Sequence, residues 1–486
     1  MLSAKIYAHA RRAPERIALV YNNNRMHYGQ FARLIEASRR HLMSRVHPGA
    51  DGVAVLAIGS ALDAWIQGLA LRSLGLTTVI SEDIGRLDVP AINCVVVTEA
   101  EYRYRANIVV ASAAAQLPFI RVPRAVYTSA ATAPLPDARD VMAAPGGHIL
   151  RTSGTTGTYK KILIDPAAEA AICAVRQQVF EVSDQSVVNL FDFGGWTGVG
   201  YQMAAATWDA GGCVVMNEGP NPHESFRYAG ITHAFVTPHL LTRILAAPPR
   251  ALRCDDSLRL FVSAGPLSWD MAQAAKVRLT RRVYHFIGST EAKFFTMTPV
   301  ETAEDVLWHR VLPPRVVQVV DDHDSPVPPG QVGRLRVNAF DAVASYLHNE
   351  DASREFFRDG YFYTGDLAVF RPDGRFALQG RVTDVINVRG DKVAAGPIEE
   401  TLRQRLGVGA VCIFSLQHED GGEMVHVAIE SILPVDRSRL TAALDGTLLS
   451  TVRTQFHFVD TLPRNHMGKV QRDMLRQRLG IPMTTP

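Results

Sequence analysis

The feature that most constrains the fold is a recurring alternation of short apolar runs with segments of helical periodicity. Residues 53–58 form an apolar run of strand length, residues 61–73 carry apolar side chains at helical spacing, and residues 76–80 form another run. A strand, a helix and a strand in this order predict a parallel β-sheet covered by helices. The alternation recurs with strand-like runs at 187–190, 212–216, 234–236, 258–262 and 283–287 and helix-like segments at 201–208, 238–245 and 269–279. The first 300 residues therefore predict layered α/β structure.

The pattern changes in the rest of the chain. Residues 313–320, 333–337 and 367–370 are short β-rich pieces separated by turns that contain proline and glycine, which predicts a small β subdomain. The C-terminal part has an α/β pattern of its own, with helix-like segments at 397–405 and 437–449 and strand-like runs at 411–415, 424–432 and 455–459. We therefore expect a large N-terminal domain over residues 1–380 and a small C-terminal α/β domain over residues 381–486.

Composition excludes some classes of partner and indicates a compartment. The 51 Lys and Arg residues against 48 Asp and Glu residues give a net charge of +3, too small to predict nucleic acid or an acidic membrane surface as a partner. The apolar stretch at 52–62 is too short to span a membrane. The basic N-terminus lacks an apolar signal core, which favours an ordinary first helix over a mitochondrial transit peptide. Five cysteines without a CxxC pattern, three of them in strand-like runs (Cys94, Cys213 and Cys412), indicate buried thiols and a cytoplasmic protein.

A polar loop at residues 151–161, with the sequence RTSGTTGTYKK, is the first candidate for a binding site. Glycines let backbone N–H groups turn toward an anion, while hydroxyl groups and a lysine add donors and positive charge. The loop does not end in the Gly-Lys-Ser/Thr of a Walker A motif. It predicts either a cradle for nucleotide phosphates or a solvated turn. The candidate phosphate-binding residues are Thr152, Ser153, Gly154, Thr155, Thr156, Gly157 and Lys160.

Five segments together resemble the motifs of the adenylate-forming superfamily, which includes acyl-CoA synthetases, adenylation domains of nonribosomal peptide synthetases, and luciferases. They are the loop at 151–161, GSTEA at 288–292, YTGD at 363–366, GRVTDVINVRG at 380–390 and PRNHMGKVQR at 463–472. They occur in the family's order over essentially the whole chain. The resemblance implies a small mobile C-terminal domain and an enzyme that uses ATP and Mg²⁺. Such an enzyme converts a carboxylic acid to an acyl-adenylate and then transfers the acyl group to a thiol.

The resemblance also implies roles for individual residues. Glu291 would hold Mg²⁺, Thr290 would contact the α-phosphate, and Lys469 would bridge the carboxylate and α-phosphate oxygens. Asp366 would accept hydrogen bonds from the ribose hydroxyls, with Arg381 supporting the same sugar. Each residue has a structural alternative: Thr290 and Glu291 as a helix cap and a first-turn acid, and the others as turn or surface residues.

Further positions follow from the same resemblance. The turn that would meet adenine contains Ala264, Gly265 and Pro266, with Ile287 standing where the family usually has an aromatic residue. We place the hinge near 380–384, at Thr383 and Asp384, and expect rotation about it to bring Arg389 and Gly390 to the active site for thiol transfer. Four departures from the family pattern mark a divergent member: Tyr159-Lys160-Lys161 at the end of the loop, Ile287, Thr383 and Asn387.

The acid pocket is expected near Asp192, Phe193 and Trp196. A buried carboxylate needs a partner, so Asp192 predicts either an amino-acid substrate whose ammonium it pairs or a structural cap. The two aromatic residues favour a small or aromatic acid, although core packing explains them equally. The leading hypothesis is an AMP-forming acid–thiol ligase with coenzyme A as acceptor. The alternatives are an adenylation enzyme that loads the phosphopantetheine of a carrier protein, and a non-catalytic adenylate-binding protein. Luciferase-like oxygenation has no sequence support of its own.

Overall fold

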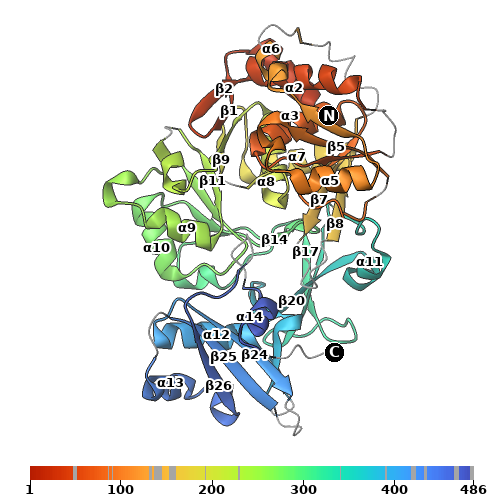
Figure 1. Ribbon diagram of the computed structural model, residues 1–486. Coiled ribbons are helices and arrows are strands. Elements are labelled where there is room, and N and C mark those ends of the chain that lie inside the picture. Colours follow the sequence, from red (N-terminus) through yellow and green to blue (C-terminus); the bar gives the residue numbers. More distant parts are fainter. Residues whose placement is uncertain are drawn as a thin grey trace. The chain divides into compact units, whose positions relative to one another are not determined.

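The computed structural model separates into two compact units (Figure 1). The first comprises Met1–Ser263, Ser268–Phe294 and Ala339–Phe357, and the second Ala264–Leu267, Phe295–Asn338 and Arg358–Pro486. Each unit is described by itself. The structure describes residues 1–46, 52–85, 87–89, 91–130, 134–135, 145–152, 160–191, 193–227, 230–339, 341–388, 391–417, 423–431, 435–464 and 470–481.

One sheet of the first unit has the strand order β6-β5-β3-β4-β7-β8. Its strands are β3 (Val53–Leu56), β4 (Thr77–Ile80), β5 (Ile92–Thr98), β6 (Phe119–Val122), β7 (His148–Thr152) and β8 (Lys160–Ile164). Strands β3 and β4 pair in parallel and are joined by α3 (Ala61–Arg72), so the predicted strand–helix–strand unit is confirmed. Strand β8 returns antiparallel to β7, and Thr152 lies opposite Lys160 in this pair.

A second sheet of the first unit carries β13-β12-β11-β9-β10-β1-β2 in that order. These strands are β1 (Ile17–Tyr21), β2 (Asn24–His27), β9 (Val187–Phe191), β10 (Cys213–Met216), β11 (His233–Val236), β12 (Arg259–Val262) and β13 (Val283–His285). Its helices include α7 (Pro166–Phe180), α8 (Gly198–Ala210), α9 (Pro238–Leu245) and α10 (Trp269–Arg278). Helix α8 begins three residues before the predicted start because Thr197 caps it, accepting a hydrogen bond from the Gly200 amide.

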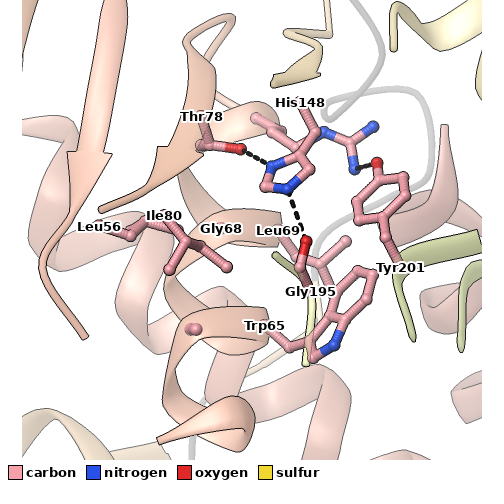
Figure 2. Close-up of a pocket in the computed structure, with 11 residues that line it drawn as sticks. Leu56, Trp65, Gly68, Leu69, Thr78, Ile80, His148, Gly195 and Tyr201 are labelled. Carbon is pink, nitrogen blue, oxygen red and sulfur yellow. Dashed lines mark hydrogen bonds between the residues drawn. The ribbon is translucent and has the colours of Figure 1, made fainter. Parts of the chain in front are cut away.

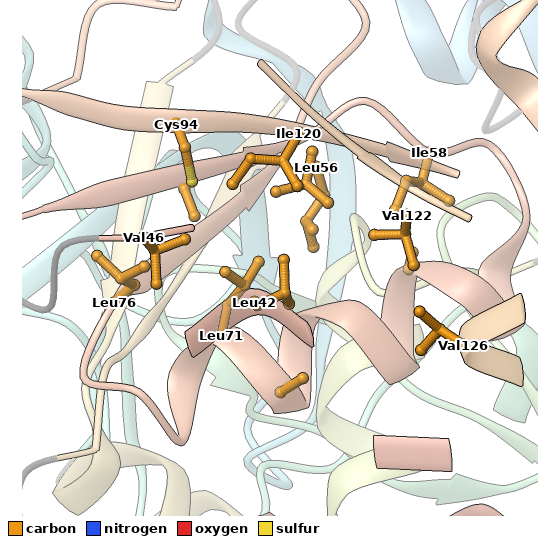
Figure 3. Packing of buried hydrophobic residues seen from close by; sticks show 14 of the residues in the cluster. Leu42, Val46, Leu56, Ile58, Leu71, Leu76, Cys94, Ile120, Val122 and Val126 are labelled. Atoms are coloured by element: carbon orange, nitrogen blue, oxygen red, sulfur yellow. The ribbon is translucent and has the colours of Figure 1, made fainter. Parts of the chain in front are cut away.

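A large apolar core of the first unit lies between strands β3, β5 and β6 and the helices that cover them, α2 (Tyr28–Met43), α3 and α6 (Arg124–Ser129) (Figure 3). Strand residues such as Leu56 and Val122 pack with helix residues such as Leu42 and Leu71. All four residues of β3 are buried, as expected for a parallel strand covered on both faces. Among the helices outside this core, α1 (Leu2–Arg12) is the predicted ordinary first helix.

The second unit contains the predicted β subdomain and the C-terminal α/β segment. Its sheets have the orders β17-β18-β20-β19 with β21 beside β20, β22-β23, and β24-β25-β26. Helix α12 (Ala395–Leu406) packs against β24. The strands are β17 (Val316–Val320), β18 (Val332–Asn338), β19 (Phe357–Arg358), β20 (Tyr361–Phe370), β21 (Phe376–Arg381), β22 (Val385–Val388), β23 (Asp391–Ala394), β24 (Ala410–Gln417), β25 (Glu423–Glu430) and β26 (Thr454–Val459).

Several predicted boundaries in the second unit were wrong. Strand β17 starts at Val316, because Pro313 and Pro314 cannot donate to a β ladder. Strand β20 begins six residues before the predicted 367–370 run and contains the whole YTGD segment. The predicted helix at 437–449 is α13 (Arg437–Leu444), which ends before Gly446, a glycine with φ of +70°.

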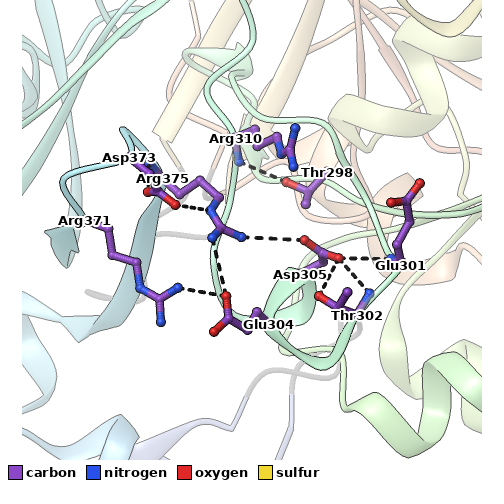
Figure 4. Close-up of polar contacts among 9 residues, drawn as sticks. All are labelled: Thr298, Glu301, Thr302, Glu304, Asp305, Arg310, Arg371, Asp373 and Arg375. Carbon is purple, nitrogen blue, oxygen red and sulfur yellow. Dashed lines mark hydrogen bonds and ion pairs between the residues drawn. The ribbon is translucent and has the colours of Figure 1, made fainter.

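Ion pairs tie the turn between β20 and β21 to a short 3₁₀ helix, Ala303–Val306 (Figure 4). Arg371 and Arg375 both reach Glu304, at 2.9 and 3.4 Å, and Arg375 also pairs with Asp373 at 2.7 Å. The Asp305 carboxylate accepts hydrogen bonds from the backbone amides of Glu301 and Thr302. These contacts hold the hairpin that leads to Arg381.

Layered α/β architecture with an added β subdomain and a C-terminal α/β segment is therefore confirmed. The expected domain boundary at 380–384 stays a prediction. Cys94, Cys213 and Cys412 are buried and free, as predicted. Among the described residues, no helix is long and apolar enough to cross a membrane.

Candidate active site

A short hairpin in the first unit carries the GSTEA segment. Strands β14 (Gly288–Ser289) and β15 (Lys293–Phe294) pair in antiparallel fashion and leave Thr290, Glu291 and Ala292 in the turn. The Glu291 side chain is buried, and its Oε1 accepts a 2.8 Å hydrogen bond from the hydroxyl of Tyr346. The Glu291 carbonyl accepts a 3.0 Å hydrogen bond from the amide of Val343. The 339–357 segment of the chain thus fixes both the backbone and the carboxylate of Glu291.

Lys160, at one end of the polar loop, approaches the same tyrosine. Thr152 and Lys160 pair across β7 and β8, and Lys160 Nζ lies 5.1 Å from the Tyr346 ring centroid. The same ammonium lies 3.3 Å from the ring centroid of Phe356, in α11 (Glu350–Phe356). A cation over two aromatic faces is held by the quadrupoles of the rings. Five predicted phosphate-binding residues lie outside the described residues: Ser153, Gly154, Thr155, Thr156 and Gly157.

Helix α8 lies against the turn of the GSTEA hairpin at its first residue, Gly198. A Cβ atom on Gly198 would lie 2.9 Å from Thr290 Oγ1, so a side chain at position 198 would force one of the two residues to shift. Predicted acid-pocket residues precede this point. Phe193 is buried, Trp196 is half-buried against the apolar core of Figure 3, and Asp192 lies outside the described residues. Core packing therefore accounts for the position of Trp196, and its role in a pocket stays a prediction.

The YTGD and GR segments come together in the second unit. Arg381 Nε lies 3.0 Å from Asp366 Oδ1, and Arg381 Nη1 donates a 2.9 Å hydrogen bond to the Thr364 carbonyl. The Asp366 amide donates to Thr364 Oγ1 at 3.1 Å, across Gly365 with its φ of +76°. Strands β20 and β21 place Asp366 directly opposite Arg381. The two predicted ribose-binding residues are therefore an ion pair in this structure.

The predicted adenine turn follows β12. Ala264 has a φ of +65°, in the left-handed region that costs a residue with a side chain about 1–2 kcal/mol. Gly265 is half-buried and Pro266 exposed, and Ile287 is half-buried just before the GSTEA hairpin. Backbone outliers of this kind cluster at functional sites.

The predicted hinge is bonded to the last helix of the chain. Thr383 and Asp384 belong to a 3₁₀ turn, Val382–Asp384. Asp384 pairs with Arg472 of α14 (Arg472–Arg478) at 2.6 Å, and Arg472 also pairs with Glu399 at 2.6 Å. Glu399 accepts a further hydrogen bond from the amide of Ile413. The remaining predictions for this unit, Lys469, Arg389 and Gly390, lie outside the described residues.

A buried lysine that the sequence did not single out lies beside the turn of the GSTEA hairpin. Lys293 is 2% exposed, and its backbone has a φ of +61°. The side-chain Nζ donates a 3.0 Å hydrogen bond to the Thr290 carbonyl. Burial, together with the nearby Arg176 guanidinium, lowers the Lys293 pKa to about 8. Arg176 in turn lies over the ring of Phe294, with Cζ 3.9 Å from its centroid, and donates to Gln202 Oε1.

A second buried polar cluster occupies the interface of α3, α7 and α8 (Figure 2). Arg72 pairs with Glu169 at 2.7 Å, and the Tyr201 hydroxyl donates to Glu169. His148 stacks on Tyr201, with ring centroids 4.5 Å apart, and hydrogen-bonds the Gly195 carbonyl at 2.9 Å. Burial lowers the His148 pKa to about 3. The space beside this cluster, lined by Arg72, His148, Tyr201 and apolar neighbours, measures about 10 Å³, room for about one water molecule. It does not hold an acid substrate.

Sequence reasoning missed Tyr346, Lys293 and Arg472 as site residues. Tyr346 stands 55 positions from Glu291, so no local spacing could have linked them. Lys293 follows the GSTEA motif by one residue, and a lysine inside an apolar run was the available signal. Arg472 closes the PRNHMGKVQR segment, but its partners come from elsewhere in the chain.

The GSTEA hairpin and the layered α/β fold agree with the resemblance to the adenylate-forming superfamily. Residues 104–347, half of the 486-residue chain, match the family of AMP-binding enzymes. The chain therefore belongs to the AMP-binding enzyme family.

Two relatives are similar to this chain in sequence, and one solved structure is similar to it in fold. The chain is 26% identical over 359 residues to 2-succinylbenzoate–CoA ligase of Bacillus licheniformis. The aligned part covers 71% of this chain and 73% of the relative. It is 26% identical over 355 residues to a fatty acid–acyl-carrier-protein ligase of Streptomyces coeruleorubidus, covering 68% of this chain and 66% of the relative. ATP-bound MatB from Rhodopseudomonas palustris superposes with a TM-score of 0.81 at 22% identity, covering 98% of each chain. That last likeness demonstrates the fold.

Proposed function

We propose that the protein is an ATP-dependent, AMP-forming acid–thiol ligase that activates a small or aromatic carboxylic acid and transfers it to coenzyme A. The observation that carries the proposal is the arrangement of Glu291, Tyr346 and Lys160. A buried carboxylate and a loop cation contact the same tyrosine, beside a loop rich in glycine and hydroxyl groups. Membership in the AMP-binding enzyme family supports this function.

In the first half-reaction, a carboxylate oxygen of the acid attacks the α-phosphorus of ATP. An oxygen–phosphorus bond forms, the bond to the β-phosphate oxygen breaks, and pyrophosphate leaves with both electrons. Positive charge and hydrogen-bond donors must offset the meeting of two anions. In this proposal Thr290 and Lys469 contact the α-phosphate, Lys160 and the loop hold the outgoing pyrophosphate, and Asp366 with Arg381 holds the ribose.

Glu291 has the character of a ligand for Mg²⁺. One carboxylate oxygen accepts from Tyr346, while Oε2 has no hydrogen-bond partner in the described part of the chain. Mg²⁺ is commonly held by one or two carboxylates together with substrate phosphates. The described residues include no group of three or more metal-ligating side chains that would form an all-protein site. Bound at Glu291, the ion would neutralise phosphate charge in the transition state.

In the second half-reaction, the thiol sulfur attacks the carbonyl carbon of the adenylate. A carbon–sulfur bond forms, the bond to the AMP oxygen breaks, AMP leaves, and the thiol gives up its proton. We assign Arg389 and Gly390 to this step after rotation at Thr383 and Asp384. A carrier-protein phosphopantetheine ends in the same thiol, and one relative is named for a carrier-protein acceptor. Coenzyme A and a carrier protein are therefore separate arms of the experiment. Cytoplasmic localisation remains part of this proposal.

The first experiment measures pyrophosphate release over a set of small carboxylic, aryl and amino acids, with coenzyme A or a carrier protein that bears a free phosphopantetheine thiol then added as acceptor. We expect acid-dependent pyrophosphate release, and thioester formation with coenzyme A. An absence of acid-dependent release across the set would contradict the proposal. Thioester formation with the carrier protein alone would replace coenzyme A as the acceptor.

A second experiment separates the half-reactions. Lys469→Ala is expected to abolish adenylate formation and to spare thioester formation from a supplied acyl-adenylate. The matched control is Lys5→Ala, since Lys5 is largely exposed and pairs with Asp209. Equal loss of both half-reactions in Lys469→Ala would contradict a lysine that acts in the first step alone.

A further inference from the structure

Lys161, one of the positions that depart from the family pattern, is a buried cation. Its side chain is 7% exposed, and its Nζ lies 2.9 Å from Oδ2 of Asp88. The same ammonium donates to the backbone carbonyl of Asp88. Among the described residues, Asp88 supplies both acceptors of the Lys161 ammonium. A buried charge that loses its counter-ion is strongly destabilised, so the position of Lys161 depends on Asp88.

The backbone of Lys161 holds a second segment of the chain. Its carbonyl accepts a 2.8 Å hydrogen bond from the amide of Leu347, the residue after Tyr346. The Tyr346 hydroxyl in turn donates to the carboxylate of Glu291. One residue of β8 therefore binds Asp88 with its side chain and the neighbour of Tyr346 with its carbonyl.

Apolar packing joins the same segments. Leu347 and Val89 pack against a cluster of buried residues that includes Leu87 and Ile149. Leu87 and Val89 flank Asp88, and Ile149 belongs to β7, the partner strand of β8. Packing and the ion pair thus connect the segment around Asp88 to β8 and to Leu347.

The first two residues of β8 are held from opposite faces. Successive side chains of a strand point to opposite sides of its sheet. The Lys160 ammonium lies over the ring of Phe356, whereas Lys161 reaches Asp88. A shift of Lys161 would therefore move the Lys160 backbone as well as the carbonyl that holds Leu347.

We propose that Asp88 is a positioning residue for Glu291, the proposed ligand of Mg²⁺. Its action passes through Lys161 and Leu347 to Tyr346, whose hydroxyl orients the Glu291 carboxylate. This inference rests on the proposed function, in which Glu291 holds the ion. Without the Asp88 carboxylate, the Lys161 ammonium moves toward water and draws the Lys161 carbonyl away from the Leu347 amide.

The test measures the Mg²⁺ concentration for half-maximal pyrophosphate release. We expect Asp88→Ala to raise this concentration about threefold or more, and Asp88→Glu to stay close to wild type because it keeps the counter-ion. Adding Lys161→Met to Asp88→Ala should restore the wild-type value, since an apolar side chain of similar length needs no counter-ion. Asp184→Ala is the matched control and should change nothing, because Asp184 pairs with the half-exposed Arg16.

A double variant tests the route from Asp88 to the metal ligand. Tyr346→Phe already removes the hydroxyl that orients Glu291, so adding Asp88→Ala to it should change the Mg²⁺ dependence by less than about twofold. Effects of the two substitutions that multiply would overturn the route through Tyr346. A wild-type Mg²⁺ dependence in Asp88→Ala, or no restoration by Lys161→Met, would overturn the positioning role itself.

Two measurements that need no turnover distinguish failure of this inference from failure of the proposed function. Amide hydrogen exchange at Leu347 should be faster in Asp88→Ala than in wild type, because the amide loses its acceptor, and Lys161→Met should reverse the change. Mn²⁺, used as a paramagnetic probe in the presence of ATP, should bind Asp88→Ala more weakly than wild type. If no acid releases pyrophosphate, the proposed reaction fails and these measurements still decide the inference. Unchanged exchange or unchanged Mn²⁺ affinity in Asp88→Ala overturns it.

Discussion

The hydroxyl of Tyr346 donates a 2.8 Å hydrogen bond to Oε1 of Glu291, although the two residues stand 55 positions apart. Tyr346 also lies under the Lys160 ammonium. The proposed metal ligand and the end of the polar loop are therefore positioned by a residue from a third segment of the chain. The first unit brings together three segments that no single motif contains.

Removing the hydroxyl of Tyr346 should weaken the metal site. Tyr346→Phe leaves the ring under Lys160 but lets the Glu291 carboxylate rotate. We expect the Mg²⁺ concentration for half-maximal pyrophosphate release to rise on the order of tenfold, since a hydrogen bond to a charged group contributes about 1.5–3 kcal/mol. Tyr363→Phe is the control, because Tyr363 is equally buried and its hydroxyl accepts from Arg336 in the second unit. Unchanged Mg²⁺ dependence in Tyr346→Phe would contradict the positioning role.

Removing the charge of Lys160 should change the KM for ATP more than the stability of the fold. Lys160→Met keeps an apolar stem against Phe356 and removes the cation, so we expect the KM for ATP to rise about tenfold while the melting temperature changes little. ATP titration and thermal unfolding measure the two quantities. A large loss of stability without a change in KM would mean that the cation–π contact is structural.

The Asp366–Arg381 pair predicts recognition of the ribose hydroxyls. Wild type should prefer ATP to 2′-deoxy-ATP, and Asp366→Asn should lose most of this preference, because an amide offers one acceptor where the carboxylate offers two. KM values for both nucleotides provide the measurement. If Asp366→Asn raised the KM for both nucleotides by the same factor, the Asp366 carboxylate would have a structural role through its ion pair with Arg381.

Buried histidines should make the protein lose stability in acid. The pKa is lowered from 6.5 to about 3 for His148 and to about 4 for His233, in both cases mainly by burial. Between pH 6.5 and the folded value, the unfolded chain binds a proton that the folded chain does not. Stability should therefore fall as pH falls through this window, by up to about 1.4 kcal/mol per pH unit for each histidine.

Urea unfolding at about pH 7 and about pH 5 measures this loss. His148→Asn should reduce the difference, because Arg72, Glu169 and Tyr201 remain around a side chain that cannot titrate. An identical difference in wild type and His148→Asn would mean that other groups dominate the pH dependence.

Arg472 should restrain the hinge turn. It binds Asp384 and Glu399 at 2.6 Å each, so Arg472→Met removes two ion pairs from partly buried carboxylates. We expect faster proteolytic cleavage near 382–384, with the free energy of global unfolding lowered by roughly 1–3 kcal/mol. The control is Arg354→Met, whose pairs with Glu350 and Asp351 lie on an exposed helix. Equal cleavage rates in both variants would contradict the restraint.

The layered fold was predictable because its signals are local. A buried parallel strand reads as a continuous apolar run, and the helices that cover it carry apolar residues at helical spacing. Residues 53–80 show both signals and fold as β3, α3 and β4. Boundaries failed where a single residue decides them, as with the Thr197 cap of α8 and the prolines before β17. Such residues act through hydrogen bonds that periodicity does not reveal.

The sequence by itself determined the order of the motifs, the chemistry of each candidate residue and the family to which the chain belongs, because these depend on residue type and spacing. Tertiary structure alone decided that Tyr346 donates a hydrogen bond to Glu291, that Lys160 lies over the Phe356 ring, and that Arg472 forms an ion pair with Asp384. It also decided that Lys293 is buried and donates to the Thr290 carbonyl. Contacts between segments far apart in the chain, and the burial of a charge, are set by packing, which the local sequence does not encode.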